Sequence, residues 1–121
     1  MSAPARIALV VDDDRITRMV HCSHLKALGF QTQEAEDGKD AVQLLEEGNK
    51  FQLILMDCEM TSMHGPEATR RIREMGIETP ILGVSSISDE TLRANFVGSG
   101  LTDLFTKPLA RDMLMPYARV G

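Results

Sequence analysis

The sequence has little of what marks several protein classes: it contains two cysteines, one tyrosine, no tryptophan and no long apolar run. Cys22 and Cys58 lie far apart and form no C-x-x-C pair, so neither a disulfide framework nor a zinc site is indicated. A membrane helix needs about 20 consecutive apolar residues, and no segment approaches that length. Basic residues are outnumbered, 13 against 18 acidic ones, and a net charge of −5 disfavours direct binding to nucleic acid or anionic membranes.

What is present suits one globular domain inside the cell. A chain of 121 residues, 43% of them hydrophobic, is long enough for one domain with an ordinary core. We therefore expect residues 1–121 to form a single domain. Unpaired cysteines are the default in a reducing compartment, so we expect a cytoplasmic location, or a nuclear one in a eukaryote.

Short apolar runs alternate with segments of helical periodicity along the chain. The predicted strands are 7–11, 30–35, 51–56, 80–84 and 104–106. Helices are predicted over 16–28, around 41–45, from Pro66 to Gly76, from Ser88 as N-cap to Gly98, and over 109–120. Pro116 must kink the last helix or lie in its first turn. Because parallel strands need helical crossovers, the alternation predicts an α/β doubly wound parallel sheet.

Polar residues follow four of the predicted strands. They are Asp12, Asp13 and Asp14 after the first strand, Asp57 after the third, Ser85 after the fourth and Lys107 after the fifth. Doubly wound sheets bind their ligands beyond the carboxyl ends of the strands, so we expect these side chains to converge at one edge. Asp14 is interpreted instead as the N-cap of the following helix.

Crowded carboxylates, a lysine and a hydroxyl indicate phosphoryl chemistry. Carboxylates about 5 Å apart repel by roughly 3 kcal/mol per pair at an effective dielectric constant of 20, so they need a cation. An all-oxygen site selects a hard cation such as Mg²⁺. Lys107 and Ser85 can stabilise a phosphoryl group in transfer, and a carboxylate can be its acceptor. Asp57 is the best candidate acceptor because it follows the most hydrophobic strand.

Four segments together resemble the motif blocks of the receiver domain of two-component response regulators. They are VVDDDRITR, LILMDCEMTSMHGPEATRRIR, PILGVSS and TDLFTKPL. The resemblance extends over essentially the whole chain in order and spacing. It implies a single five-stranded, flavodoxin-like (βα)5 domain with strand order 2-1-3-4-5. A nucleotide- or flavin-binding protein of similar topology is disfavoured, because no G-x-G-x-x-G or P-loop follows the first strand.

The resemblance also implies roles for individual residues. By this resemblance, Asp57 accepts a phosphoryl group from a phosphohistidine donor, and Ser85 and Lys107 contact the phosphoryl oxygens. The implied ligands of Mg²⁺, with Mn²⁺ as an alternative, are Asp12, Asp13, Asp57 and the backbone carbonyl of Glu59. Glu59 and Ile87 are implied to flank the path of the hydrolytic water and to set the lifetime of the phosphoaspartate. A cis peptide bond is implied between Lys107 and Pro108.

One position departs from the family pattern. Receivers usually carry an aromatic residue three positions before the lysine, and it rotates inward when the domain is phosphorylated. Here that position is Leu104. Phe105 is aromatic but one place along, so on a strand it should face the opposite side of the sheet. Phosphorylation chemistry is expected to be retained, whereas the usual aromatic switch is missing.

The function implied by the resemblance is that of a phosphorelay receiver. Its partner would be a histidine kinase or a histidine phosphotransfer protein, and it would act as a monomer or weak dimer. Phosphorylation would shift an equilibrium between two conformations. Two alternatives stay open: a phosphohistidine phosphatase or phosphate sink acting on a phosphotransfer protein, and a phosphorylation-independent binding module. Such a domain catalyses its own phosphorylation and dephosphorylation without being classed as an enzyme.

The subgroup and the output are also indicated by the sequence. The GVSS block and the proline of the last helix resemble stand-alone plant-type receivers and the receivers of hybrid histidine kinases. Nothing follows Gly121 in this sequence, so we expect any signal to leave through a protein surface.

Overall fold

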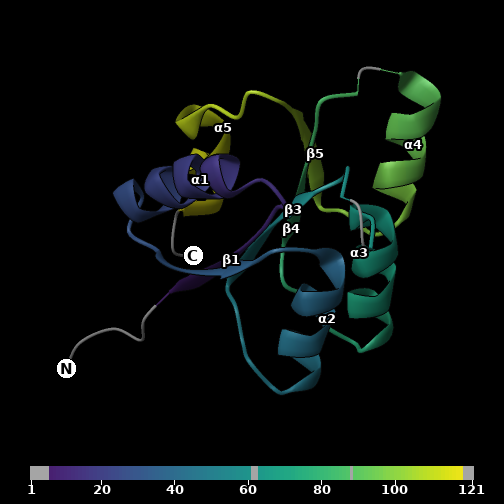
Figure 1. Ribbon diagram of the computed structural model, residues 1–121, viewed down its shortest axis with the longest axis horizontal. Coiled ribbons are helices and arrows are strands. Elements are labelled where there is room, and N and C mark those ends of the chain that lie inside the picture. The colour runs from purple at the N-terminus through teal and green to yellow at the C-terminus, as the bar shows by residue number, and fades with distance from the viewer. Residues whose placement is uncertain (1–5, 61–62, 88, 119–121) are drawn as a thin grey trace.

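A computed structural model describes residues 6–60, 63–87 and 89–118, and these form five strands alternating with five helices (Figure 1). The strands are β1 (Ile7–Val11), β2 (Gln31–Ala35), β3 (Leu53–Asp57), β4 (Ile81–Ser85) and β5 (Asp103–Thr106). The helices are α1 (Arg15–Ala27), α2 (Gly38–Glu46), α3 (Gly65–Glu74), α4 (Glu90–Gly98) and α5 (Arg111–Ala118).

All five strands are parallel and form one sheet in the order β2-β1-β3-β4-β5. The predicted doubly wound sheet and its strand order are therefore confirmed. From β1 the chain moves to β2 at one edge, and then returns past β1 to β3 and on to β5. The strand order thus reverses between β1 and β3, and in such sheets ligands bind beyond the carboxyl ends of the strands at this reversal.

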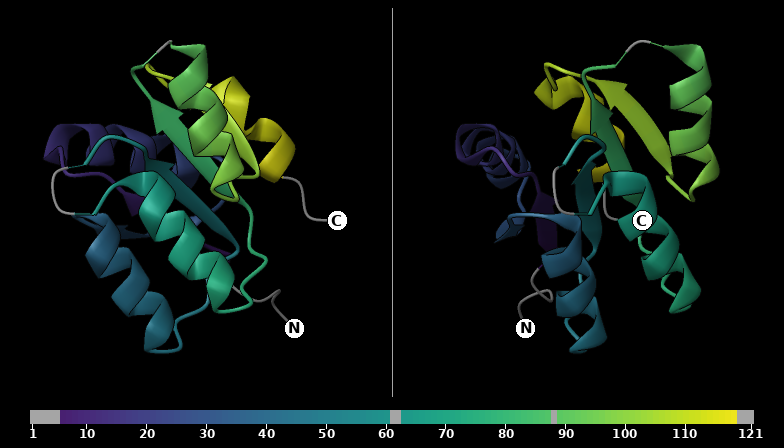
Figure 2. Two further views of the ribbon diagram at one scale, coloured as in Figure 1. Left: turned by 90° about the vertical axis from the view of Figure 1, so that its right-hand side faces the viewer. Right: turned by 45° about the vertical axis from the view of Figure 1, so that its right-hand side comes forward.

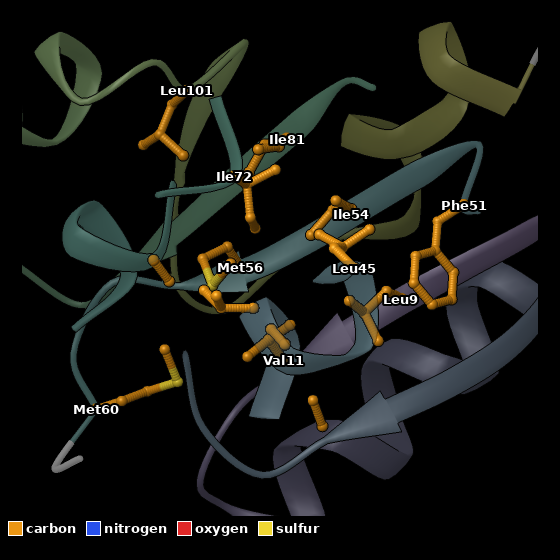
Figure 3. Close-up of a cluster of buried hydrophobic side chains, with 14 of the residues drawn as sticks. Leu9, Val11, Leu45, Phe51, Ile54, Met56, Met60, Ile72, Ile81 and Leu101 are labelled. Atoms are coloured by element: carbon orange, nitrogen blue, oxygen red, sulfur yellow. The ribbon is translucent and has the colours of Figure 1, made fainter. Parts of the chain in front are cut away.

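Helices cover both faces of the sheet, with α1 and α5 on one face and α2, α3 and α4 on the other (Figures 1 and 2). Successive side chains of a strand point to opposite faces, so the central strands contribute to two cores. Leu9 and Ile54 pack with Ile72 of α3 in the core shown in Figure 3. Val10 and Leu55 belong to the core beneath α1 and α5.

The ends of two central strands differ from the sequence prediction. β3 spans Leu53–Asp57 rather than 51–56, and β4 ends at Ser85 rather than at residue 84. An unbroken apolar run has no alternation that fixes its ends, whereas pairing with the neighbouring strands does. As a result, Asp57 and Ser85 are the last residues of their strands, which fixes their backbones in the sheet.

The last helix, α5, is shorter than the predicted 109–120, and Pro116 lies in its second half, so the first-turn alternative is wrong. A proline inside a helix removes one backbone hydrogen bond. The fully buried Leu114 anchors α5 on the sheet and offsets this loss. The predicted N-cap of α4, Ser88, lies outside the described residues.

Candidate functional site

Three carboxylates meet at the carboxyl edge of the sheet, beside the reversal of strand order. Asp12 directly follows β1, Asp13 is the next residue, and Asp57 ends β3. One oxygen of each carboxylate lies within 4.8 Å of the others. Asp12 and Asp57 are buried, with 1% and 2% of their surface exposed, whereas Asp13 is exposed. The structure thus brings together the three acids that the sequence analysis placed at one edge.

The third acid of the Asp12–Asp14 run has a different role. Asp14 is the N-cap of α1, as predicted, and its Oδ2 accepts a hydrogen bond from the backbone N–H of Thr17 at 2.9 Å. The Thr17 hydroxyl donates to the same oxygen, and these hydrogen bonds lower the pKa of Asp14.

The carboxylate cluster is incompletely satisfied by the protein. Asp12 Oδ1 accepts the backbone N–H of Asp14 at 2.8 Å, but its buried Oδ2 has no hydrogen-bond partner among the described residues. Lys107 Nζ lies 3.5 Å from this Oδ2, which is an ion pair without a hydrogen bond. The same Nζ donates to Asp57 Oδ1 at 3.1 Å, and the backbone N–H of Glu59 donates to that oxygen at 3.2 Å. One lysine therefore faces two buried carboxylates.

Burial and charge shift the pKa values of these groups. Burial, and then the neighbouring Asp12 carboxylate, raise the pKa of Asp57 to about 6 in spite of Lys107. Burial alone would lower the pKa of Lys107, but Asp57 and Asp12 outweigh it and the pKa is raised. At neutral pH Lys107 is charged and Asp57 is ionised at a cost, which a divalent cation would reduce.

Lys107 is brought to the site by the connection after β5. Its backbone N–H donates to the carbonyl of Ser85 at 2.9 Å, which holds this connection against the end of β4. The peptide bond between Lys107 and Pro108 is cis, as the resemblance implied. The lysine side chain thus crosses from the end of β5 to the carboxylates at the ends of β1 and β3.

The side of the site next to β4 is organised by Glu59. The fully buried Ser85 donates its hydroxyl proton to Glu59 Oε2 at 2.5 Å and accepts the backbone N–H of Ile87 at 3.0 Å. Glu59 Oε1 accepts the backbone N–H and the hydroxyl of Ser86, at 2.8 and 2.7 Å. Burial alone would raise the pKa of Glu59, but these hydrogen bonds outweigh it and the pKa is lowered.

These contacts of the Glu59 carboxylate were not predicted from the sequence. The predicted roles of Glu59 were a backbone carbonyl that binds Mg²⁺ and a place beside the path of the hydrolytic water. The contacts follow from the pairing of β3 with β4, which places the residues after Asp57 beside those after Val84. A pattern read along one chain carries no signal for them.

Two further residues that the sequence analysis did not select hold the site in place. Gly65 begins α3 against the end of β3: a Cβ there would overlap the carbonyl oxygen of Asp57 and lie 2.8 Å from the Cα of Cys58. Arg18 of α1 is buried, and it donates to the carbonyl of Asp12 at 2.7 Å and to Glu34 at 2.9 Å. Its spacing of four residues from the N-cap Asp14 was the available signal, because residues four apart lie on the same face of a helix.

Two further residues beside the site have structural roles. Cys58 is buried, and burial raises the pKa of its thiol to about 12, as suits a structural cysteine. Leu104 packs in the core beneath α2 and α3, whereas Phe105 packs against the opposite core. Phe105 therefore does not take the place of the missing aromatic residue.

Together these groups define a class of protein. A buried carboxylate lies beside two further carboxylates that suit a hard cation, and beside a lysine that can neutralise phosphoryl oxygens. The site lies where a doubly wound sheet binds its ligands. Such a fold and site suit a domain that receives a phosphoryl group on an aspartate.

Comparisons with known proteins identify the family. The family model described as response regulator receiver domain matches residues 8–119. The chain is 41% identical over 108 residues to two-component response regulator 24 of Arabidopsis thaliana, covering 89% of this chain and 78% of that protein. It is 35% identical over 106 residues to the sensor histidine kinase RcsC of Salmonella typhimurium, covering 88% of this chain and 11% of the kinase.

A solved structure agrees with these sequence matches. The receiver domain of the sensor histidine kinase PA1611 from Pseudomonas aeruginosa, with a magnesium ion coordinated in its active-site cleft, is 30% identical with a TM-score of 0.83, and 95% of each chain is covered. The chain belongs to the response regulator receiver domain family and is a receiver of two-component phosphorelay systems. Within the described residues, no helix has the length and apolar character needed to span a membrane.

Proposed function

We propose that Asp57 of this receiver accepts a phosphoryl group from a phosphohistidine donor, in a Mg²⁺-dependent reaction that changes the conformation of the domain. The observation that carries the proposal is the position of the buried Asp57 beside both a second buried carboxylate and Lys107. A carboxylate whose pKa is raised to about 6 is still ionised at neutral pH, and burial leaves it poorly solvated and reactive.

The residues present fit a hard divalent cation. The three carboxylates offer oxygens within 4.8 Å of one another, and the buried Oδ2 of Asp12 has no hydrogen-bond partner in the described part of the chain. Asp12, Asp13, Asp57 and the backbone carbonyl of Glu59 would hold Mg²⁺, or Mn²⁺ in its place. The bound ion supplies positive charge against the phosphoryl oxygens.

The protein's own groups perform the remaining chemistry. A carboxylate oxygen of Asp57 forms the new bond to phosphorus while the bond from phosphorus to the donor's histidine nitrogen breaks. Lys107 Nζ, already 3.1 Å from Asp57 Oδ1, stabilises the charge on the phosphoryl oxygens. The Ser85 hydroxyl donates to one of these oxygens once the group is in place. Glu59 and Ile87 border the path of the hydrolytic water and set the lifetime of the phosphoaspartate.

The wider setting is part of the proposal. Residues 1–121 form one receiver domain, a monomer or weak dimer in the cytoplasm or, in a eukaryote, the nucleus. The family exchanges phosphate with histidine kinases or phosphotransfer proteins, and both a response regulator and a sensor histidine kinase are among the relatives. We propose a partner of one of these two kinds.

A phosphate sink acting on a phosphotransfer protein is the second candidate function. It is favoured by Leu104, which is 9% exposed and packs in the core where an output-competent receiver usually has a rotating aromatic residue. A domain without that switch can still take up and hydrolyse phosphate. The lifetime of the phosphoaspartate separates the two functions, because a sink requires rapid hydrolysis.

Intact-mass spectrometry tests the proposal. Wild type and Asp57→Asn are incubated with a small phosphoramidate donor, with and without Mg²⁺, and followed over time. We expect one adduct of about 80 Da, a single HPO₃, in the wild type with Mg²⁺ only. An adduct of the same yield on Asp57→Asn would exclude Asp57 as the acceptor. The decay time of the adduct distinguishes a stable signal from a phosphate sink.

A further inference from the structure

The Ser85 hydroxyl has a single proton, and in this structure that proton is donated to Glu59 rather than toward Asp57. Ser85 is fully buried, and its oxygen also accepts the backbone N–H of Ile87. If Ser85 is to donate to a phosphoryl group on Asp57, as the proposed function requires, it must release Glu59. One donor therefore serves two mutually exclusive acceptors.

The Glu59 carboxylate makes three hydrogen bonds to two consecutive residues. Oε2 accepts from the Ser85 hydroxyl at 2.5 Å, and Oε1 accepts from the backbone N–H and hydroxyl of Ser86 at 2.8 and 2.7 Å. Hydrogen bonds to a charged acceptor are stronger than neutral ones, and two donors on one oxygen fix its direction. The chain just after β4 is thereby held toward the residues that follow β3.

Glu59 is also positioned to oppose a phosphoryl group electrostatically. Its backbone N–H already donates to Asp57 Oδ1 at 3.2 Å, so its side chain is attached beside the acceptor. A phosphoryl group on Asp57 would bring further negative charge next to the Glu59 carboxylate. Both charges would compete for the proton of Ser85. Lys107 makes its ion pairs with Asp57 and Asp12, and its attraction to Glu59 is the weaker one.

We propose that Glu59 is a positioning residue that clamps Ser85 and Ser86 in the unphosphorylated form and that must release them when Asp57 is phosphorylated. We call these three side chains the serine clamp. The inference rests on the proposed function. Because the clamp must open before Ser85 can donate to a phosphoryl group, the clamp lowers the affinity of the site for that group, and its release moves the segment after β4.

The test measures binding of beryllofluoride, a mimic of the phosphoryl group, at saturating Mg²⁺ by isothermal titration calorimetry. In Glu59→Ala the clamp is absent, and we expect affinity to rise about tenfold, as for the loss of one charged hydrogen bond. In Ser86→Ala one hydrogen bond is lost without any change of charge, and we expect a rise of roughly threefold. In the double variant Ser86→Ala should add nothing, because the bond it removes is already gone.

A second readout follows the clamp itself. The amide resonance of Ser86 should shift upfield in Glu59→Ala, and in the wild type when beryllofluoride binds, because both events remove the carboxylate acceptor. A variant with a merely structural defect would change many amides and would not reproduce the shift caused by beryllofluoride. The Mg²⁺ affinity of each variant is measured without beryllofluoride. Any change in Mg²⁺ binding caused by the loss of the Glu59 charge can then be separated from the change in beryllofluoride affinity.

The outcomes separate the two proposals. No beryllofluoride binding by the wild type would overturn the proposed function, and the clamp with it. Binding by the wild type with unchanged or weaker affinity in Glu59→Ala would overturn the clamp alone. A tenfold gain in Glu59→Ala with no effect of Ser86→Ala would also overturn it, because charge repulsion alone would then explain the gain.

Discussion

The amino edge of the sheet, where the strands begin, is held by hydrogen bonds that satisfy their donors and acceptors, whereas the carboxyl edge collects like charges. At the amino edge, Arg73 donates to the carbonyls of Gly100, Ile77 and Thr79 at 3.0, 2.9 and 2.8 Å. At the carboxyl edge, three carboxylates lie within 4.8 Å of one another and Asp12 Oδ2 has no hydrogen-bond partner among the described residues.

The difference shows how polar groups divide between stability and function in this fold. Both edges bury polar groups in connections between strands and helices. Satisfied groups stabilise the fold, whereas crowded and unsatisfied ones cost stability and are retained where a ligand completes them. Substitutions at the amino edge should therefore act independently of Mg²⁺, and those at the carboxyl edge should depend on it.

The largest effect is expected from the amino edge. Arg73→Ala leaves three carbonyls without their donor, and we expect the free energy of unfolding to fall by about 3 kcal/mol. Urea unfolding with and without Mg²⁺ measures it, and the loss should be the same in both. Arg73→Lys keeps the positive charge but has a less suited donor group, so we expect a smaller fall in the free energy of unfolding than in Arg73→Ala. If Mg²⁺ restored the stability of Arg73→Ala, the expected difference between the two edges of the sheet would be wrong.

At the carboxyl edge we expect an unusual pH dependence. The pKa of Asp57 is raised from 3.8 to about 6, so the folded protein binds this proton more tightly than the unfolded one. Stability from this group is present below pH 4 and is lost as the pH rises through about 6, by roughly 3 kcal/mol.

The measurement is metal-free unfolding of wild type and Asp57→Asn from pH 4 to 8. Subtracting the free energy of unfolding of the wild type from that of the variant cancels the contributions of the other carboxyl groups. This difference should grow in favour of the variant as the pH rises from 4 to 8. A difference independent of pH would show that Asp57 is not destabilised by its surroundings.

A smaller effect is expected at Lys107, which is the counterion of two buried carboxylates. Lys107→Met keeps much of the side-chain volume, and we expect it to reduce metal-free stability by about 1–2 kcal/mol. Mg²⁺ should restore most of the loss, because it supplies the missing positive charge. Chemical unfolding at low and saturating Mg²⁺ checks this. Equal losses of stability at low and at saturating Mg²⁺ would show that Lys107 does not act as the counterion of these carboxylates.

The smallest effects are expected for Asp13 and Asp14, which are adjacent in the sequence but have different proposed roles. Asp14→Ala removes the N-cap of α1 and should lower the stability only slightly, with the Mg²⁺ affinity unchanged. Asp13→Asn removes a proposed ligand and should weaken Mg²⁺ binding while raising metal-free stability slightly. Calorimetric Mg²⁺ titration of both variants makes the comparison. Weaker binding by Asp14→Ala, or normal binding by Asp13→Asn, would reverse the assignment.

Much of this arrangement could be predicted from the sequence. Asp12, Asp57, Ser85 and Lys107 stand at the ends of apolar runs, and in a parallel sheet those ends share one edge by topology alone. The position of Asp14 before an amphipathic segment was enough to identify an N-cap.

The rest depends on contacts between elements distant in the sequence. The Glu59 carboxylate contacts serines 26 and 27 positions away, and Arg73 contacts carbonyls of two connections. The ends of β3 also follow from pairing with its neighbours, because a uniform run of apolar residues does not define them. Such features arise from packing and have no periodic signature.

The most direct test of the carboxyl-edge account is the stability of wild type and Asp57→Asn at pH 7.5, without Mg²⁺ and with Mg²⁺ at about 100 times its Kd. Without the ion we predict that the variant is the more stable protein, by about 2–3 kcal/mol. With the ion the wild type should gain about 2.7 kcal/mol and the difference should close. A metal-free wild type as stable as Asp57→Asn, with equal gains from Mg²⁺, would contradict the claim that burial and the neighbouring carboxylate destabilise the Asp57 anion until a cation binds.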